Sequence, residues 1–431
     1  MSAMFSSLSI FNYRVWASGA IVSNIGTWMQ RIAQDWLVLT HLTDNNATAV
    51  GVVMALQFGP SILLLPVTGM AADHFDRRKL LMITQGAMGA LALGLGLLTI
   101  TGLVQLWQVF LFAFLLGCVT AFDTPARQTF VSDLVPGSSL SNAVALNSTS
   151  FNGARLIGPA VAGVLIAVLG TGWVFISNGL SFSAVLASLA ILRTHELVHR
   201  DRPAREPGSF MEGFRYVWSR PDLKAILLML FLLGTFGMNF PIYLSTMSVT
   251  VFNAGAGAFG ILTSAMALGS VVGALLSARR ARPKVTLLLA GASVFAISLA
   301  FAAIAPTYAL FAIALMIVGV ASQTLMTTAN STVQLSTDPA MRGRVIAILM
   351  AVIMGGTPIG APIIGWVANS YGPRAAIGLG AVAGLLSACV GLFYLIRYHH
   401  LRLHRIGWRL RISQSEPEHL TAMFEEVSTA R

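Results

Sequence analysis

Long apolar stretches recur along most of the chain and are separated by short polar segments. A helix needs about 20 residues to cross the roughly 30 Å hydrocarbon core of a bilayer. Twelve stretches reach that length, and apolar runs of this length indicate membrane-spanning helices rather than strands. The predicted spans are residues 15–40, 48–71, 80–101, 104–123, 141–168, 173–192, 222–248, 255–278, 285–304, 307–329, 343–369 and 375–396. The pattern therefore predicts an all-α membrane protein with twelve transmembrane helices.

The longest polar interruption divides these spans into six and six. We expect an N-terminal six-helix half at residues 1–192, a cytoplasmic linker at 193–221, a C-terminal six-helix half at 222–396 and a cytoplasmic tail at 397–431. Within the linker, the amphipathic segment FMEGFRYVW (210–218) predicts a short helix at the membrane surface. We interpret the basic, partly apolar start of the tail as a second surface helix.

An internal repeat supports two related halves. The segment IGPAVAG (Ile157–Gly163) recurs as IGAPIIG (Ile359–Gly365), and the same offset superimposes Gly170 on Gly372. Parallel repeats related by an axis along the membrane normal occur in one large class of secondary transporters, which bind substrate between the repeats near the midplane. The repeat therefore predicts two pseudo-symmetric six-helix bundles.

Composition and charge placement agree with a membrane location. Hydrophobic residues make up 56% of the chain and charged residues only 10%, whereas a soluble domain carries about a quarter charged residues. All Lys and Arg except Arg31, Arg155 and Arg374 fall in alternate loops or at the chain ends. This positive-inside asymmetry places both termini in the cytoplasm, so the net charge of +11 reports topology and does not indicate nucleic-acid binding.

The loop after the second predicted span carries the strongest local motif, GMAADHFDRRK. It resembles the signature G-x-x-x-D-x-x-G-R-R-K/R of the major facilitator superfamily. The matching residues are Gly69, Asp73, Arg77, Arg78 and Lys79, and Asp76 stands where the family usually has glycine. In the family, the residue matching Asp73 pairs across the cytoplasmic face and stabilises the outward-open state. The resemblance therefore implies a major facilitator fold with an inner gate at these residues.

A basic loop that only sets topology is the alternative interpretation of this motif. It would explain Arg77 to Lys79 but neither Gly69 nor Asp73. The copy in the second half, GALLSARRAR, has Ser277 where the acid would stand. We therefore expect the gate network to be weaker there.

The fifth predicted span contains FNGARLIGPAVAG. It resembles the glycine–proline motif of the superfamily's antiporters, which is associated with exporters. The motif residues are Gly153, Arg155, Gly158, Pro159 and Gly163. Proline removes a helix hydrogen bond and can kink the span, while glycines allow neighbouring helices to approach closely. A kinked, closely packed helix without a preferred direction of transport is the alternative.

Four further segments narrow the resemblance. Residues 26–39, 121–136, 142–160 and 341–360 look like the bacterial twelve-helix exporter branch that includes enterobactin-exporter and macrolide-efflux-like proteins. This branch implies an exporter and leaves the substrate open. We expect a bacterial inner-membrane secondary exporter of amphipathic small molecules, such as drugs or siderophores, that works by proton antiport and alternating access. Two alternative hypotheses keep the same fold, namely an exporter of metal ions and a small-molecule importer. A third hypothesis, from another functional class, is a non-transporting membrane scaffold or sensor.

Charges within the spans are candidate functional groups, because ionisable residues inside a membrane are costly. Asp35 and Arg31 lie one turn apart on the first span, and an ion pair between them would lower the cost of burying both. A carboxylate that exchanges its proton between the two sides could couple transport, although hydration near the outer end would explain Asp35 equally well. Arg155 could orient an anionic cargo, or it could hydrogen-bond helix carbonyls and Asn152.

Two more charged groups lie at the inner ends of spans. Asp123 and Arg127 are one turn apart on the fourth span, and Arg342 and Arg344 begin the eleventh. We interpret them as further inner-gate residues, with plain surface pairing as the alternative.

The sequence contains neither a P-loop nor a cluster of His, Cys and acidic residues with metal-site spacing. We therefore expect no enzymatic activity, no cofactor and no metal. The expected partners are a small-molecule substrate, protons and the lipid bilayer, and the expected oligomeric state is a monomer.

Overall fold

The computed structural model describes residues 3–64, 67–68, 71, 75–198, 210–278, 285–338, 341–398, 401–406 and 409–414. The first half contains α1 (Phe11–Leu37), its π-helical continuation η2 (Val38–Leu42), α2 (Ala47–Leu63), α4 (Arg77–Ile100), α5 (Leu106–Leu134), α6 (Leu140–Leu169) and α7 (Thr171–Ile191). Short 3-10 turns flank these helices at η1 (Ala3–Ser9), η3 (Gly137–Ser139) and η4 (Thr194–Glu196).

The second half follows the surface helix α8 (Phe210–Ser219). It contains α9 (Pro221–Leu232), η5 (Leu233–Gly237), α10 (Phe240–Thr246), η6 (Met247–Val251), α11 (Ala256–Ala278), α12 (Val285–Ile304), α13 (Tyr308–Ser336), α14 (Arg342–Tyr371) and α15 (Pro373–Tyr398). The strands β1 (Leu401–Ile406) and β2 (Arg409–Gln414) come last.

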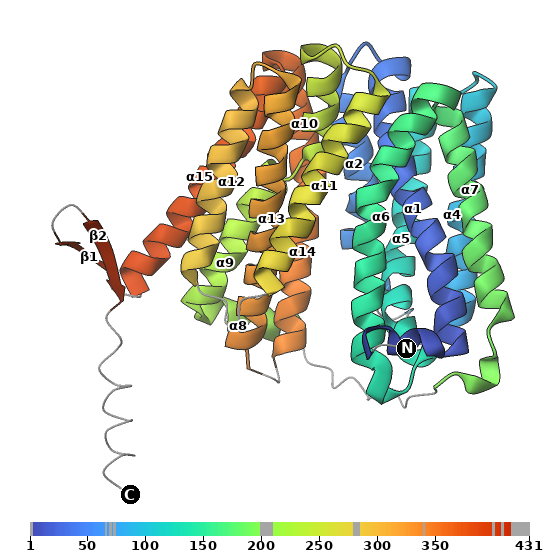
Figure 1. Cartoon of the computed structure of the whole chain (residues 1–431), viewed down its shortest axis with the longest axis horizontal. Helices are drawn as coiled ribbons and strands as arrows, with labels where there is room; N and C mark the ends of the chain where they lie inside the picture. The colour runs from blue at the N-terminus through green and yellow to red at the C-terminus, as the bar shows by residue number, and fades with distance from the viewer. Residues whose placement is uncertain are drawn as a thin grey trace, which may run out of the picture.

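Ten helical segments of the described chain are long and apolar enough to cross a membrane, and one of them, Pro221–Val251, comprises α9 to η6. The two helices α1 and α2 run beside them. The first has 27 residues with many polar positions, and the second has 17 residues. The expected all-α twelve-helix fold is therefore confirmed for the membrane part, and Figure 1 shows its two bundles side by side.

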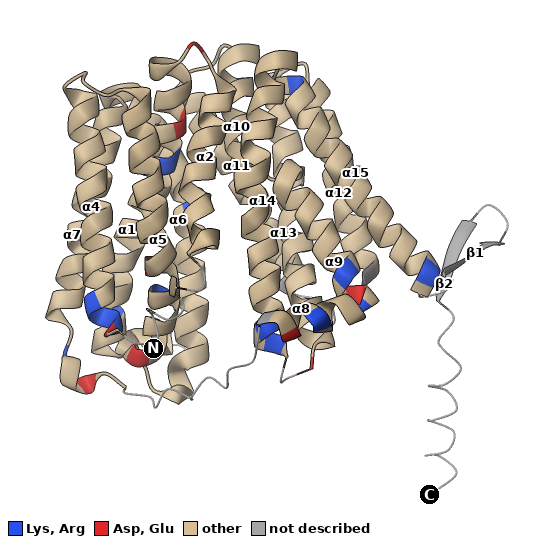
Figure 2. Ribbon diagram, turned by 180° about the vertical axis from the view of Figure 1, so that it is seen from behind, with Lys and Arg blue, Asp and Glu red and all other residues tan. Residues whose placement is uncertain are grey.

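Charged residues gather at one end of the two bundles, the lower end in Figure 2. This end, here called the basic end, carries Arg77, Arg193, Arg220 and Arg344. At the opposite end, called the far end, Arg374 donates hydrogen bonds to the carbonyls that end α12, Ala303 (3.0 Å) and Ala305 (2.9 Å).

The two halves pack through two pairs of helices, α2 against α14 and α6 against α11. Glycines permit the close approach. A Cβ on Gly163 of α6 would meet the Ala256 carbonyl oxygen of α11 at 3.0 Å, and one on Gly365 of α14 would meet the backbone of Ala47 in α2. Because a larger side chain at either site would push the helices apart, these contacts depend on small residues.

The sequence repeat has an equivalent in the backbone. Gly170 ends α6 with φ 87° and ψ 168°, and Gly372 ends α14 with φ 90° and ψ 161°. This left-handed conformation favours glycine because it has no Cβ. The same helix therefore ends in the same way in both halves, as two pseudo-symmetric bundles require.

The seventh pass through the bundle is not a continuous α-helix. It changes to the π-helical η5 and breaks at Met238 and Asn239 before Pro241 opens a new helical turn. The Asn239 amide donates to the Thr235 carbonyl (2.7 Å), which replaces a bond lost at the break. A proline cannot donate a helix hydrogen bond, which explains why the interruption falls here.

The helix expected at 210–218 is confirmed as α8. It lies at the basic end of the second half, where Glu212 pairs with Arg344 (2.7 Å) and the Tyr216 hydroxyl donates to Asp338 (3.0 Å). Phe214 and Trp218 stack on its exposed side at 5.4 Å between ring centroids. This aromatic face suits the water–lipid boundary.

The tail differs from the expected surface helix. Residues 401–406 and 409–414 form a two-stranded antiparallel hairpin in which Leu401 pairs with Gln414 and Ile406 with Arg409. The segments LRLHRI and RLRISQ alternate apolar and polar residues with a period of two, which favours strands. The helix interpretation of this segment is therefore wrong.

Candidate functional site

A stripe of polar residues runs along one face of α1. Asn24, Arg31 and Asp35 follow each other at intervals of seven and four residues, which places them on one side of a helix with 3.6 residues per turn. Asn24 and Asp35 are buried, with exposed fractions of 4% and 5%, and Arg31 is half-buried. The first helix therefore carries both candidate coupling residues on a face directed into the protein.

The expected ion pair between Arg31 and Asp35 is absent, because no cation lies within 4.0 Å of the Asp35 carboxylate among the described residues. Side chains on a helix point toward its N-terminus, so Arg31 extends away from Asp35. The acid-first order is better for an i,i+4 pair. Asp123 and Arg127 have that order and do pair, at 3.0 Å.

Arg31 instead packs against aromatic rings. Its Cζ atom lies 4.9 Å from the ring centroid of Trp28 and 5.3 Å from that of Phe58 on α2. Trp28 in turn makes an edge-to-face contact with Phe151 of α6 at 5.8 Å. A guanidinium over aromatic faces gains a cation–π interaction, which is stronger where water is excluded. Arg31 is thus held by rings, and its guanidinium makes no ion pair within 4.0 Å among the described residues.

Arg155 faces the space between the two halves. Gly158 packs on α1, while Pro159 and Gly163 pack on α11. Successive residues of an α-helix are rotated by about 100° around its axis. Arg155 therefore points between the side of α6 that packs on α1 and the side that packs on α11, one turn before Pro159. The exposed stripe of α6 lies on the opposite side and consists of Ile157, Val161, Val164 and Val168.

Arg155 makes neither a side-chain hydrogen bond nor an ion pair with any described residue. The expected alternative, hydrogen bonds to Asn152 and helix carbonyls, is not found, because Asn152 donates to the Ser148 carbonyl instead (2.9 Å). A hydrogen bond between the halves lies one residue away, where Ser264 of α11 donates to the Leu156 carbonyl (3.4 Å).

Asp123 is buried at 3% exposure in a network of three helices. Its carboxylate accepts hydrogen bonds from Thr84 (2.8 Å) and Gln85 (2.6 Å) of α4 and from Arg127 (3.1 Å). Arg127 also donates to Asn24 of α1 (2.6 Å). The pair therefore joins α1, α4 and α5 inside the first half, so the alternative of plain surface pairing does not apply to it.

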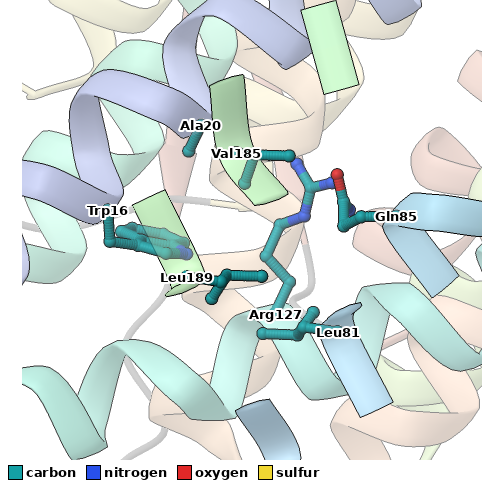
Figure 3. Close-up of a pocket in the computed structure, with 7 residues that line it drawn as sticks. All are labelled: Trp16, Ala20, Leu81, Gln85, Arg127, Val185 and Leu189. Carbon is teal, nitrogen blue, oxygen red and sulfur yellow. The ribbon is translucent and has the colours of Figure 1, made fainter. Parts of the chain in front are cut away.

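A small pocket lies beside this network. Figure 3 shows Arg127 extending from α5 toward Gln85, and the pocket is also lined by Trp16, Ala20, Leu81, Val185 and Leu189. These residues all belong to the first half. The pocket is therefore part of the interior of one bundle and not of the interface between the two.

The basic residues of the loop motif are bound within their own half. Arg77 holds Asp133 of α5 through bonds of 2.7 and 2.9 Å. Arg78 donates to the Leu189 carbonyl of α7 (2.7 Å). Asp76, which replaces the family glycine, caps α4 by accepting from the backbone N–H of Lys79 (2.9 Å).

Gly69 and Asp73 lie outside the described residues. The other inner-gate candidates sit at the basic end of α14. Arg344 pairs with Glu212 of α8, while Arg342 is exposed on the first turn. The described gate candidates thus have partners in their own half or, like Arg342, are exposed.

The antiporter-type motif divides into packed and open positions. A Cβ on Gly158 would meet the Cβ of Trp28 at 2.6 Å and the Ile25 carbonyl oxygen at 3.1 Å. At Gly153 a Cβ would meet nothing within 4 Å, so close packing expected there is wrong. Gly153 lies toward the basic end of α6, beyond the segment that contacts the second half.

Apart from the bond between Ser264 and Leu156 near the middle of α6, the hydrogen bonds that join the halves within the described residues lie toward the far end. Asn369 of α14 donates to Asn46 (2.6 Å) and Thr48 (3.0 Å) and accepts from the Ala47 N–H (2.8 Å) at the start of α2. Trp36 of α1 stacks on Phe259 of α11 at 5.8 Å. The far end is therefore closed, whereas the charged groups of the basic end pair within each half.

Comparisons with known proteins agree with this architecture. Residues 2–404 match the transmembrane secretion effector family of major facilitator proteins, MFS_3. The chain belongs to this family.

Two relatives of this chain are transporters named for their cargo. The staphyloferrin A transporter of Staphylococcus aureus is 26% identical over 388 residues, which cover 88% of this chain and 94% of the relative. The enterobactin exporter EntS of Escherichia coli K12 is 25% identical over 373 residues, covering 85% and 86%. The resemblance to the bacterial exporter branch is confirmed. The protein is a secondary transporter that exports small molecules across the bacterial inner membrane.

Solved structures show the same fold. A bacterial homologue of the human lysosomal transporter Spinster, in an inward-facing and unoccupied conformation, gives a TM-score of 0.73 at 15% identity and covers 91% of this chain and 97% of its own. A D-xylose–proton symporter gives 0.71 at 13% identity, covering 89% and 98%. At these low sequence identities, the structural similarity establishes only the fold of this protein.

Several polar residues with partners on other helices were not predicted from the sequence. Asn24, Gln85 and Asp133 complete the networks of Arg127 and Arg77, and Asn369 joins the halves. Polar residues inside otherwise apolar spans were the available signal, since such residues usually have partners. Their partners lie on other helices, however, and a single sequence does not reveal them. Within the described ranges, no three His, Cys, Asp or Glu residues lie together as metal ligands.

Proposed function

We propose that this transporter exchanges cytoplasmic small molecules for external protons and that Asp35 carries the proton. The observation behind the proposal is that Asp35 is a buried carboxylate without a hydrogen-bond or ion-pair partner among the described residues. The carboxylate of Asp123, by contrast, is occupied by three donors. A proton carrier has to be able to gain and lose its proton during the cycle, and an unoccupied carboxylate is better suited to that.

The proposal includes an orientation. The basic end faces the cytoplasm under the positive-inside rule, so both termini are cytoplasmic. The closed far end then faces outward, and the conformation is inward-facing. In the other conformation the halves close at the basic end, and Asp73 with Arg77, Arg78 and Lys79 forms the gate.

The proposed cargo is an amphipathic small molecule, a siderophore or a drug, and the relatives' names support the first class. Export is tested by expressing the chain in an efflux-deficient bacterium and screening siderophores and drugs for reduced retention. Everted vesicles then show whether accumulation of an exported compound needs a proton gradient. Accumulation that survives collapse of the gradient would contradict proton antiport while leaving export intact.

Asn369 tests the alternating-access part of the proposal. Asn369→Ala removes three hydrogen bonds that join α14 to the start of α2. Each contributes about 0.5–1.5 kcal/mol in general, and less where water competes, so we expect an outward-open population about tenfold larger. Electron paramagnetic resonance measures the outward-open population through the distances between spin labels at the far ends of α2 and α14. Unchanged distance distributions would show that apolar packing alone holds this end closed.

The gate is tested by an asymmetric pair of variants. Asp73→Asn removes the acid of the first-half motif, and we expect export to fall about tenfold or more at normal membrane levels because a charge-assisted contact is lost. Ser277→Ala alters the matching position in the second half. There the hydroxyl only donates to the Gly273 carbonyl within its own helix (2.8 Å), so little change is expected. Equal rates for both variants and the wild type would remove the gating role.

A further inference from the structure

Two partly buried arginines of the first half lie away from the ends of membrane-spanning helices and make no ion pair with a carboxylate among the described residues. They are Arg31 on α1 and Arg155 on α6. By contrast, Arg77, Arg127 and Arg344 each pair with an acid. Cations inside a membrane protein normally pair with an anion or line a polar pathway. Among the described residues, Asp35 is the only acid near Arg31, and it makes no ion pair within 4.0 Å, while Arg155 has no acidic partner, so an anion bound from outside the protein would supply the contact that both guanidinium groups lack.

Aromatic side chains connect the two arginines into one surface. Arg31 covers Trp28 and Phe58, Trp28 contacts Phe151, and Phe151 precedes Arg155 by one turn of the same helix face. This group of five residues, the arginine–aromatic surface, comes from α1, α2 and α6. Phe151 keeps 47% of its surface exposed. Because the hydrogen bond from Ser264 to Leu156 lies next to Arg155, the surface begins where the contact between the halves ends.

We propose that the arginine–aromatic surface is the cargo-binding site of the first half and that its ligand is an organic anion with an apolar or aromatic body. A guanidinium offers parallel N–H donors that match the two oxygens of a carboxylate. The rings of Trp28, Phe58 and Phe151 cover the apolar body and exclude water, which strengthens the charge interaction. The inference rests on the proposed export function and specifies the charge of its substrate.

The charge of the surface determines its preference. Arg31 and Arg155 contribute two positive charges and Asp35 at most one negative charge, so the site stays cationic whether or not Asp35 holds a proton. A cationic cargo would be repelled. Outward movement of an anion and inward movement of a proton both carry positive charge inward, so a negative-inside potential drives both. A bound anion attracts a proton to Asp35, which favours binding of both at once. Exchange of one for the other therefore requires that the proton leave Asp35 before the anion binds.

Three fluorescent probes that share a pyrene body test the preference. They are 1-pyrenebutyrate, 1-pyrenebutanol and a trimethylammonium analogue, which are anionic, neutral and cationic. Binding to the purified full-length protein is measured by fluorescence anisotropy. We expect the anion to bind at least about tenfold more tightly than the neutral probe, because a charge-assisted contact contributes that much or more. Equal binding of the three probes, or a preference for the cation, would overturn the inference.

Variants of Arg155 assign the effect to this surface. Arg155→Gln should remove most of the preference for the anion, and Arg155→Lys should retain part of it because the charge remains. Arg14→Gln is the matched control, since Arg14 is an exposed arginine on α1 outside the surface. A preference that persists in Arg155→Gln at unchanged thermal stability would contradict the assignment. Should Arg155→Gln fail to fold, the order of the three probe affinities in the wild type and in Arg155→Lys still tests the preference for an anion.

Binding and transport fail separately in this design. If the protein binds the anionic probe through Arg155 but no compound is exported from cells, the proposed export function fails and the binding site stands. If cells export only neutral or cationic compounds, the charge preference is wrong and export stands.

Discussion

Asp35→Asn abolishes export against a concentration gradient, while exchange of cargo down its gradient continues. This is the largest effect that we expect, because asparagine keeps the size of the side chain and removes the group that titrates. Proteoliposomes with an imposed pH gradient measure the first activity, and counterflow of labelled cargo without a gradient measures the second. Since Arg31 is held by Trp28 and Phe58 and not by Asp35, the variant should fold normally.

Asp44→Asn is the control for this experiment. Asp44 is an exposed acid near the far end and should be replaceable without loss of coupling. Adding Arg31→Gln to Asp35→Asn should leave coupling absent. If Asp35→Asn alone still accumulated cargo in response to a pH gradient, the proton would have to use another acid, with Asp123 the first candidate, or the exporter would not be proton-driven.

Gly158→Leu reduces export strongly even at normal membrane levels. A Cβ at this position already meets the Cβ of Trp28 at 2.6 Å, and leucine adds further atoms, so α6 and α1 must separate. Overpacking of this kind costs about 1–3 kcal/mol of stability. Because Trp28 also contacts Arg31 and Phe151, the displacement reaches the proposed cargo site. Export rate and melting temperature measure the two consequences.

The same substitution at an open glycine provides the comparison. Gly378 lies in α15, where a Cβ would meet nothing within 4 Å, so Gly378→Leu should be close to neutral. If Gly158→Leu were as active and as stable as Gly378→Leu, the contact between α6 and α1 would not matter for transport.

The order and type of the helices could be predicted because the bilayer leaves few choices. A long stretch of apolar residues has to satisfy its own backbone hydrogen bonds, and only a helix does so within one segment. The surface helix α8 was likewise predictable from its amphipathic pattern. The tail was misread because short basic segments with few apolar residues fit a helix and a strand almost equally well, and pairing between β1 and β2 decides.

The candidate site was only partly predictable. Asp123 and Arg127, one helical turn apart, do pair, but the same spacing suggested a pair between Arg31 and Asp35 that does not form. The difference lies in the order of acid and base along the helix and in the rings available to Arg31. Gly158 and Gly163 pack closely as expected, whereas Gly153 belongs to the part of α6 that faces open space.

The sequence by itself determined the membrane location, the twelve helices, the repeat and the family resemblance, because these follow from composition and from residues close together in the chain. The tertiary structure alone decided that the far end is closed through Asn369, that Asp35 makes no ion pair within 4.0 Å, and that Arg31 and Arg155 share one aromatic surface. These features join α1, α2, α6 and α14, whose residues lie up to several hundred positions apart. Contacts over such separations depend on how the bundles pack, which local patterns do not specify.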